Sequence, residues 1–217
     1  MKQITSFWNY FQKNEQVILN ALLLGINTDE VLTQISRNLN TISKRIDFVI
    51  KAPITVNDKF IIIFTCFGYR KLFPKVVALE NQAPILQHFT AQAFIKPLQD
   101  ITKYTNGTDE PCICKNYQIK ISEIQMALLD YNIESKHLKI NIYLPHYNKL
   151  KQFDDLKSNI NWIIMQIIGE IAFQKHIQQI KINQLPFEVN GLLSLVELPY
   201  FIEYLYKINT RDKTGIM

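Results

Sequence analysis

The sequence predicts an α+β protein with a mainly antiparallel sheet, an N-terminal helical hairpin and a C-terminal helix. Two observations support this fold class. Two strand patterns, an amphipathic helix and a further strand follow one another near residues 46–95, and the same order of patterns returns near residues 125–183. The chain also contains only 6 Gly and 8 Pro among 217 residues, which is typical of mostly regular structure. We therefore expect two ββαβ units within a single domain, residues 1–217.

Helical periodicity dominates the first 45 residues. Large apolar side chains recur on one helical face at Phe7, Phe11, Ile18 and Leu22. Gly25 can end this helix in a left-handed conformation, and a second apolar stripe follows over residues 31–42. This pattern predicts a helical hairpin over residues 5–45.

The first predicted unit begins with strands at residues 46–50 and 60–64. The second of these is apolar on both faces, which is typical of a central strand that is covered on both sides. Pro74 suits the first turn of the helix that follows, and residues 89–95 alternate as a closing strand.

The second predicted unit follows a loop over residues 97–116. Two strand patterns over residues 126–132 and 138–144 predict a hairpin. A long apolar helix is expected over residues 155–175. A strand over residues 177–185 and a final helix over residues 195–208 complete the chain. Because the long helix is apolar on both sides, we expect it to be sandwiched, or else to present an exposed face to a partner.

Composition argues against nucleic-acid binding. The formal net charge is +5, but 20 of the 24 basic residues are Lys. Arg is the residue whose planar guanidinium forms paired hydrogen bonds with phosphates and bases. Segments ending at residues 45, 100, 150 and 217 carry +2, +2, +1 and 0, so none of the four holds the excess. The aromatic and basic segment from Phe64 to Arg70 does not fit the RNA-recognition pattern. We expect no nucleic-acid partner.

The expected compartment is a reducing cytoplasm. The N-terminal residues do not form an uncharged signal-peptide core, and no stretch reaches the length and apolarity of a membrane span. Three Cys do not make a disulfide framework. We therefore expect no membrane association.

The motifs of common catalytic sites are missing from the sequence. The six glycines are isolated, so neither a phosphate loop nor a nucleophile elbow is present, and we expect no cofactor. Cys112 and Cys114 could offer two soft ligands to a metal ion, but no second Cys pair completes a zinc site. We expect no metal.

Four residues are pocket candidates: Arg70, His146, Tyr147 and Glu170. His146 and Tyr147 follow a predicted strand, where functional loops often lie, although a surface histidine is the favoured interpretation. Glu170 borders the apolar stripe of the long helix, so a buried carboxylate would have a raised pKa and could act as an acid or base. The favoured alternative is an edge carboxylate that reaches solvent or pairs with Lys or Arg.

Several segments point to one family. They are Phe7-Trp8-Asn9-Tyr10-Phe11, Leu72-Phe73-Pro74-Lys75-Val76 with Ala83-Pro84, Tyr143-Leu144-Pro145, Gly169-Glu170, and Gly191-Leu192-Leu193-Ser194-Leu195 with Leu198-Pro199. Together they resemble an uncharacterised family of bacterial proteins, mostly from Bacteroidota. The resemblance spans nearly the whole chain and implies no activity, so no functional residue is carried over. Phe89 departs from the pattern, since relatives would have Trp there.

Two classes of function remain open. The absence of catalytic constellations favours a non-enzymatic, cytoplasmic protein-interaction module with a possible protein partner. The alternative is a small-molecule-binding or enzymatic domain with its site between the two units, where the four candidates would gather.

Overall fold

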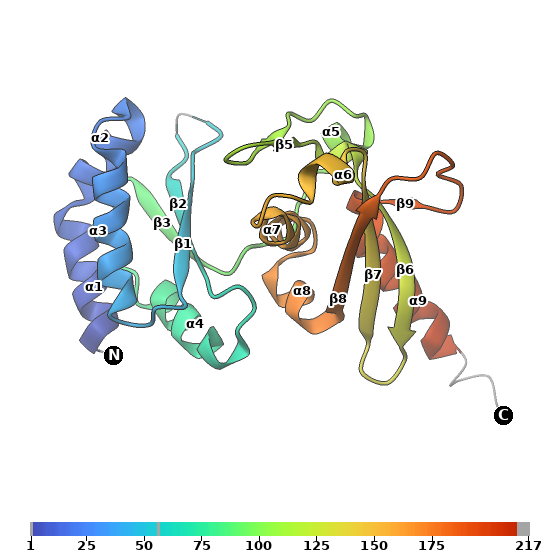
Figure 1. Ribbon diagram of the computed structural model, residues 1–217. Coiled ribbons are helices and arrows are strands. Elements are labelled where there is room, and N and C mark those ends of the chain that lie inside the picture. Colours follow the sequence, from blue (N-terminus) through green and yellow to red (C-terminus); the bar gives the residue numbers. More distant parts are fainter. Residues whose placement is uncertain (1, 56, 212–217) are drawn as a thin grey trace. The chain divides into compact units, whose positions relative to one another are not determined.

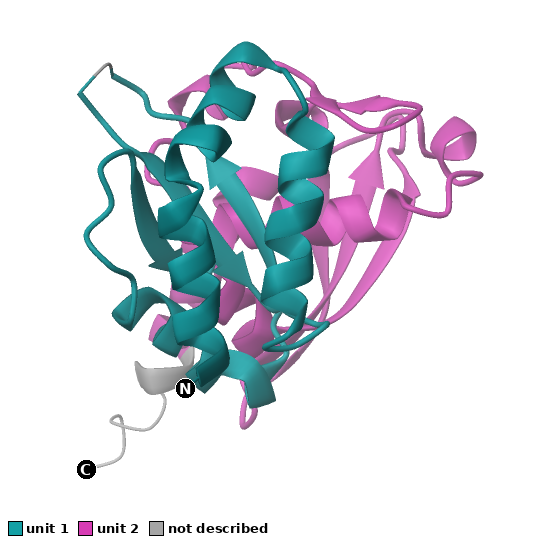
Figure 2. Ribbon diagram, turned by 90° about the vertical axis from the view of Figure 1, so that its left-hand side faces the viewer, with its two compact units in different colours: residues 1–95 teal, residues 96–217 magenta. Residues whose placement is uncertain are grey.

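The computed structural model describes residues 2–55 and 57–211. The chain divides into two compact units, residues 1–95 and 96–217 (Figure 2). Each unit combines helices with a sheet of its own, which confirms the predicted α+β class. No helix in the described part of the chain combines the length and apolarity that a membrane span requires.

Three helices open the first unit, where the sequence predicted a hairpin of two. They are α1 (Lys2–Lys13), α2 (Glu15–Leu24) and α3 (Thr28–Asn40). The first predicted helix is divided at Asn14, whose side-chain amide donates a 2.8 Å hydrogen bond to the carbonyl oxygen of Tyr10. This bond competes with regular helix geometry. Gly25 ends α2 in the left-handed conformation, with φ 68°, as predicted.

The sheet of the first unit has the order β1-β2-β3 (Figure 1). Its elements are β1 (Asp47–Lys51), β2 (Phe60–Thr65), the 3-10 turn η1 (Arg70–Leu72), α4 (Phe73–Asn81) and β3 (Phe89–Ala93). Strand β2 pairs antiparallel with β1 and parallel with β3. The all-apolar strand is therefore central, as its sequence predicted.

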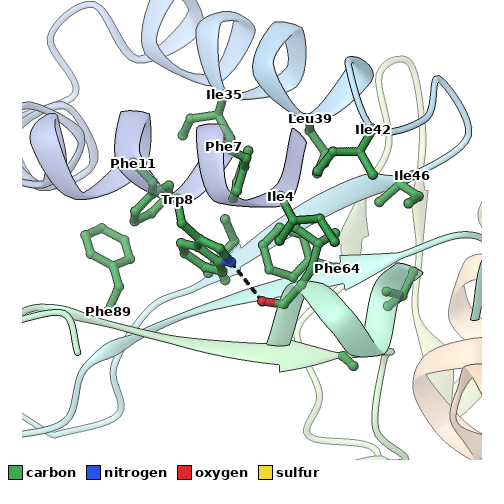
Figure 3. Close-up of a cluster of buried hydrophobic side chains, with 14 of the residues drawn as sticks. Ile4, Phe7, Trp8, Phe11, Ile35, Leu39, Ile42, Ile46, Phe64 and Phe89 are labelled. Carbon is green, nitrogen blue, oxygen red and sulfur yellow. Dashed lines mark hydrogen bonds between the residues drawn. The ribbon is translucent and has the colours of Figure 1, made fainter. Parts of the chain in front are cut away.

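Aromatic side chains fill the core of the first unit (Figure 3). Phe7 and Phe11 of α1 are buried, and they meet β2 and β3 edge-on. The ring centroids of Phe7 and Phe64 lie 5.6 Å apart, and those of Phe11 and Phe89 lie 5.2 Å apart. Edge-to-face pairs at these distances are favourable beyond simple burial, so they hold α1 on the sheet.

The second unit contains the remaining elements. They are α5 (Thr102–Thr105), β4 (Cys112–Ile113), β5 (Gln118–Ile119), η2 (Ile121–Glu123), β6 (Gln125–Asn132), β7 (His137–Leu144), α6 (Tyr147–Leu150), α7 (Leu156–Ile168), α8 (Glu170–His176), β8 (Ile177–Gln184), β9 (Leu193–Ser194), η3 (Leu195–Glu197) and α9 (Leu198–Arg211). The predicted loop over residues 97–116 thus contains a short helix and a short strand.

A four-stranded sheet in the order β8-β7-β6-β9 forms the frame of this unit. Strand β7 pairs antiparallel with β6 and parallel with β8, so these three strands repeat the directions of β1, β2 and β3. Helices α7 and α9 contribute to the same core as this sheet. Strands β4 and β5 form a separate two-stranded antiparallel sheet, and most strand pairs in the described chain are antiparallel.

Gly169 interrupts the long helix that the sequence predicted. Its φ of 82° and ψ of 152° lie in a region that only glycine adopts readily, so α7 ends there and α8 begins at the next residue. Helix α7 is covered on both of its apolar sides. Its isoleucines enter the core, Met165 is buried, and Trp162 is half-buried. Within the predicted long helix, Ile171 of α8 is 50% exposed, so the alternative of a partner-facing side stays a prediction.

Candidate functional site

The four predicted pocket residues belong to different parts of the fold. Arg70 is exposed at the start of η1 in the first unit, and the other three lie in the second unit. His146 is exposed and precedes α6, where its carbonyl oxygen accepts hydrogen bonds from the main-chain N–H groups of Lys149 and Leu150. Tyr147 is half-buried against the core of that unit. His146 therefore has the surface-loop position that was favoured for it.

Glu170 is completely buried, so it is not an edge carboxylate that reaches solvent. It opens α8 directly after Gly169. The helical periodicity of the sequence did not show the break at Gly169 that precedes this residue.

A groove lies among the first three helices of the chain. It has a volume of about 510 Å³ and is lined by residues of α1, α2 and α3 and of the turn between α2 and α3. Its buried floor includes Ile18 and Ala21 of α2, and Val31 of α3 is half-buried beside them. Since this groove lies wholly within the first unit, its shape depends on three helices that pack on one another.

Large aliphatic side chains line the groove while remaining open to solvent. The exposed fractions are 57% for Val17, 66% for Leu24 and 61% for Ile26. Single exposed aliphatic residues are ordinary, but three such residues around one apolar groove are typical of a surface that another molecule covers.

The polar residues of the groove lie mainly on its rim. They include Asn20, Asn27 and Gln34, together with one charged residue, Glu30, in the first turn of α3. Glu30 has no ion-pair partner within the described part of the chain. Tyr10 also lines the groove, and burial raises the pKa of its phenol. At neutral pH this hydroxyl is therefore protonated.

Most of the described lining residues of the groove are aliphatic or carboxamide side chains. The described lining contains no Ser, Cys, His or Lys. Elsewhere in the described chain, no group of three or more His, Cys, Asp and Glu side chains is arranged to hold a metal ion.

The cysteine pair of the sequence lies at β4, with Cys112 in the strand and Cys114 directly after it. Cys112 and Cys114 are both half-buried free thiols, and burial raises the pKa of each one. A raised pKa keeps these groups as thiols at neutral pH, and the thiolate is the form that binds metals and attacks electrophiles.

A signal for the groove was present in the sequence. Asn20 is the only polar residue from Val17 to Ile26, so this stretch is apolar all round and not only on the face that carries Ile18 and Leu22. A surface helix of this kind needs cover on two sides. The core of the first unit provides cover for one side only.

Comparison with models of known protein families, with characterised proteins and with solved structures finds no significant match to this chain. The resemblance to an uncharacterised bacterial family stays a prediction.

Proposed function

We propose that this protein is a non-enzymatic protein-interaction module whose helical groove receives an amphipathic helix of a partner protein. The observation that carries this proposal is the exposure of Val17, Leu24 and Ile26 around one apolar groove. Burying these side chains against a partner would gain about 25 cal/mol for each Å² of apolar surface removed from water.

A helix is the occupant that best suits the shape and chemistry of this surface. A groove between helices accepts apolar side chains that recur every three or four residues on one face of a helix. An extended strand instead binds mainly through the main-chain groups of a sheet edge, and the described lining of the groove comes from helices and the turns between them, with no strand. The polar rim can pair with the polar flank of such a helix.

Charge complementarity adds one requirement for the partner. Glu30 is the one charged side chain among the described residues that line the groove, and no described cation pairs with it. We therefore infer that the partner helix carries Lys or Arg beside its apolar face. Such a pair at the rim would influence the association rate and the register more than the affinity.

The proposed setting is a bacterial cytoplasm. All three cysteines are free, with Cys66 buried and the other two half-buried, as expected for a protein that folds in a reducing compartment. The competing hypothesis, a small-molecule-binding or enzymatic domain with Arg70, His146, Tyr147 and Glu170 around one site, stays a prediction.

The first experiment is site-specific crosslinking in the native host. A photoreactive amino acid in place of Leu24 should form a crosslink to one segment of one protein. A synthetic peptide with the sequence of that segment should become helical on binding the full-length protein, as measured by circular dichroism. Leu24→Asp should weaken peptide binding at least about tenfold, because burying an unpaired charge in an apolar contact has a high free-energy cost of desolvation.

A matched control distinguishes specific binding at this groove from non-specific hydrophobic association. Ile85→Asp places the same charge at an exposed aliphatic residue of the first unit that does not line the groove, and it should leave peptide binding unchanged. In addition, Glu30→Lys should weaken binding, and reversing the charge of the contacting basic residue of the peptide should restore it. Equal effects of both aspartate variants, or a peptide that binds without becoming helical, would contradict the proposal.

A further inference from the structure

We propose that a second hollow in the first unit, at the carboxyl end of β2, binds a small ligand in which a planar aromatic ring is joined to a phosphate monoester. A nucleoside monophosphate represents this chemical class. This site is independent of the helical groove and goes beyond the proposed interaction function.

The hollow has a volume of about 540 Å³, within the range of small-molecule sites. It lies between the end of α3, the connection from α3 to β1, and the loop that follows β2. Strand β2 is parallel to β3. Sites for small ligands often form outside the carboxyl ends of parallel strands, where the loops that follow the strands are free to carry side chains.

Two cations line the hollow. The guanidinium carbon of Arg45 lies 4.7 Å from the centroid of the Tyr69 ring, and Lys44 is the preceding residue. A cation at this distance from an aromatic ring is attracted to the ring face, and the N–H groups of a guanidinium can form bidentate hydrogen bonds with a phosphate. Neither cation forms an ion pair with any described residue. A phosphate monoester carries close to two negative charges at neutral pH and would match the pair.

One carboxylate also lines the hollow, that of Asp47. Its Oδ1 atom accepts a 2.8 Å hydrogen bond from the main-chain N–H of Phe48, so the acid already has a partner within its own strand. The polar side chains of the lining that could face an anion include those of Ser36, Asn40, Lys44 and Arg45.

Phe67 provides the flat apolar surface that an aromatic ring requires. It is 53% exposed, although it is a large apolar residue, and its φ is 49°. Bulky residues rarely adopt this left-handed conformation, which costs free energy relative to the right-handed one. The buried hydroxyl of Thr65 accepts a 3.1 Å hydrogen bond from the main-chain N–H of Phe67 and helps to hold it there. Strain of this kind collects at binding sites.

The local charge of the sequence supports an anionic ligand. Residues 37–75 contain eight Lys and Arg against two Asp, and they include three of the four arginines of the chain. The charge totals of residues 1–45 and 46–100 do not show this excess of Lys and Arg, because the boundary at residue 45 divides the basic segment between them. Lys75 is already engaged, since its ammonium donates a 3.0 Å hydrogen bond to the carbonyl oxygen of Ile42. The excess therefore does not depend on that residue.

Isothermal titration of the full-length protein with three probes tests this inference. Adenosine 5′-monophosphate carries both the ring and the phosphate, adenosine lacks the phosphate, and ribose 5-phosphate lacks the base. We expect one molecule of adenosine 5′-monophosphate per chain, and binding of the other two probes should be at least about tenfold weaker, because each one loses a whole class of contact.

Variants locate the binding. Arg45→Gln and Tyr69→Leu should each weaken binding of adenosine 5′-monophosphate at least about tenfold, the first by removing the charge and the second by removing the ring that orients it. Arg37→Gln is the matched control, because it removes the same charge from an exposed residue of α3 that does not line the hollow. Circular dichroism melting verifies that each variant is folded.

Three results would overturn the inference. They are no binding of adenosine 5′-monophosphate, equal weakening by Arg37→Gln and Arg45→Gln, and equal affinity for ribose 5-phosphate and adenosine 5′-monophosphate. Leu24→Asp, which disrupts the helical groove, should leave nucleotide binding unchanged. The two sites can therefore fail or succeed separately.

Discussion

The indole Nε1 of Trp8 donates a 2.9 Å hydrogen bond to the backbone carbonyl oxygen of Leu79, 71 residues away in the sequence (Figure 3). This bond joins α1 to the last turn of α4. The main-chain N–H of Ala83 would bond to Leu79 in a continuing helix, but it bonds to the carbonyl oxygen of Glu80 instead. Trp8 therefore satisfies one of the carbonyl groups that a helix end leaves without a partner.

Replacing this indole should destabilise the protein. Trp8→Phe removes the donor and leaves a buried carbonyl unsatisfied, which costs about 1–3 kcal/mol of unfolding free energy, with a smaller contribution from lost packing. Urea denaturation measures this change. Tyr200→Phe, at an exposed residue of α9, is the control and should stay within about 0.5 kcal/mol of the unsubstituted protein. A similarly small effect of Trp8→Phe would show that the bond contributes little.

Tyr117 should make the protein sensitive to alkaline pH. Its hydroxyl donates a hydrogen bond to Asp155 and accepts one from Asn159. Burial is the main reason that its pKa is raised from 10.0 to about 12. In the window between these values the unfolded chain loses this proton while the folded chain keeps it, so the free energy of unfolding falls as pH rises.

The corresponding experiment compares urea denaturation at several pH values above 9 for the unsubstituted protein and for Tyr117→Phe. The variant should be less stable at neutral pH, because it loses both hydrogen bonds, and its stability should fall less steeply above about pH 10. Burial also raises the pKa of Tyr10 and Tyr131, so part of the slope should remain. An unchanged slope would exclude Tyr117 as its source.

His176 should make the folded protein less stable at acidic pH. The side chain is buried, its Nδ1 lies 3.2 Å from the carbonyl oxygen of Lys136, and its ring meets Tyr206 edge-on. Burial lowers the pKa of this imidazole below 6.5, and nearby Lys175 lowers it further. As pH falls below 6.5, the unfolded chain takes up a proton that the folded chain resists, so stability is lost.

His176→Phe removes this titration while keeping a ring in the cavity. Between about pH 7 and pH 5 the variant should lose less unfolding free energy than the unsubstituted protein, even if it is less stable at pH 7. His146→Gln is the matched control, because His146 is exposed, and it should leave the acid dependence unchanged. Parallel acid dependence in His176→Phe and the unsubstituted protein would contradict the assignment.

Phe67 allows a test of strain against binding. Phe67→Gly and Phe67→Ala both remove the ring, but only glycine adopts a φ of 49° without steric cost. The glycine variant should therefore be more stable than the alanine variant by about 1 kcal/mol, as measured by urea denaturation. Both should weaken binding of adenosine 5′-monophosphate. Equal stability of the two variants would show that this conformation stores no strain.

Local patterns predicted the strands and the fold class well. The all-apolar run over residues 60–64 is the central strand β2, and the alternation over residues 177–185 is β8. These patterns are reliable because side-chain alternation and β-branched composition report directly on which faces of a strand are covered.

The helix breaks at Asn14 and Gly169 were not predicted. Apolar periodicity continues through both positions, whereas the breaks depend on a side-chain hydrogen bond at Asn14 and on a positive φ at Gly169. The two proposed binding surfaces were not predicted for a related reason, since Leu24 and Arg45 come to line a hollow only when α2, α3 and the loop after β2 pack together.

By itself the sequence determined the α+β class, the places of the main strands and helices, and the lack of phosphate loops and nucleophile elbows, because each of these follows from residues that are close along the chain. The tertiary structure alone decided which apolar side chains stay exposed and which cations meet an aromatic ring. Val17 and Ile18 are neighbours of similar character, yet one is 57% exposed and the other is fully buried. That difference arises from packing between helices that are separate in sequence, and exposure and charge clustering in space are the properties on which binding depends.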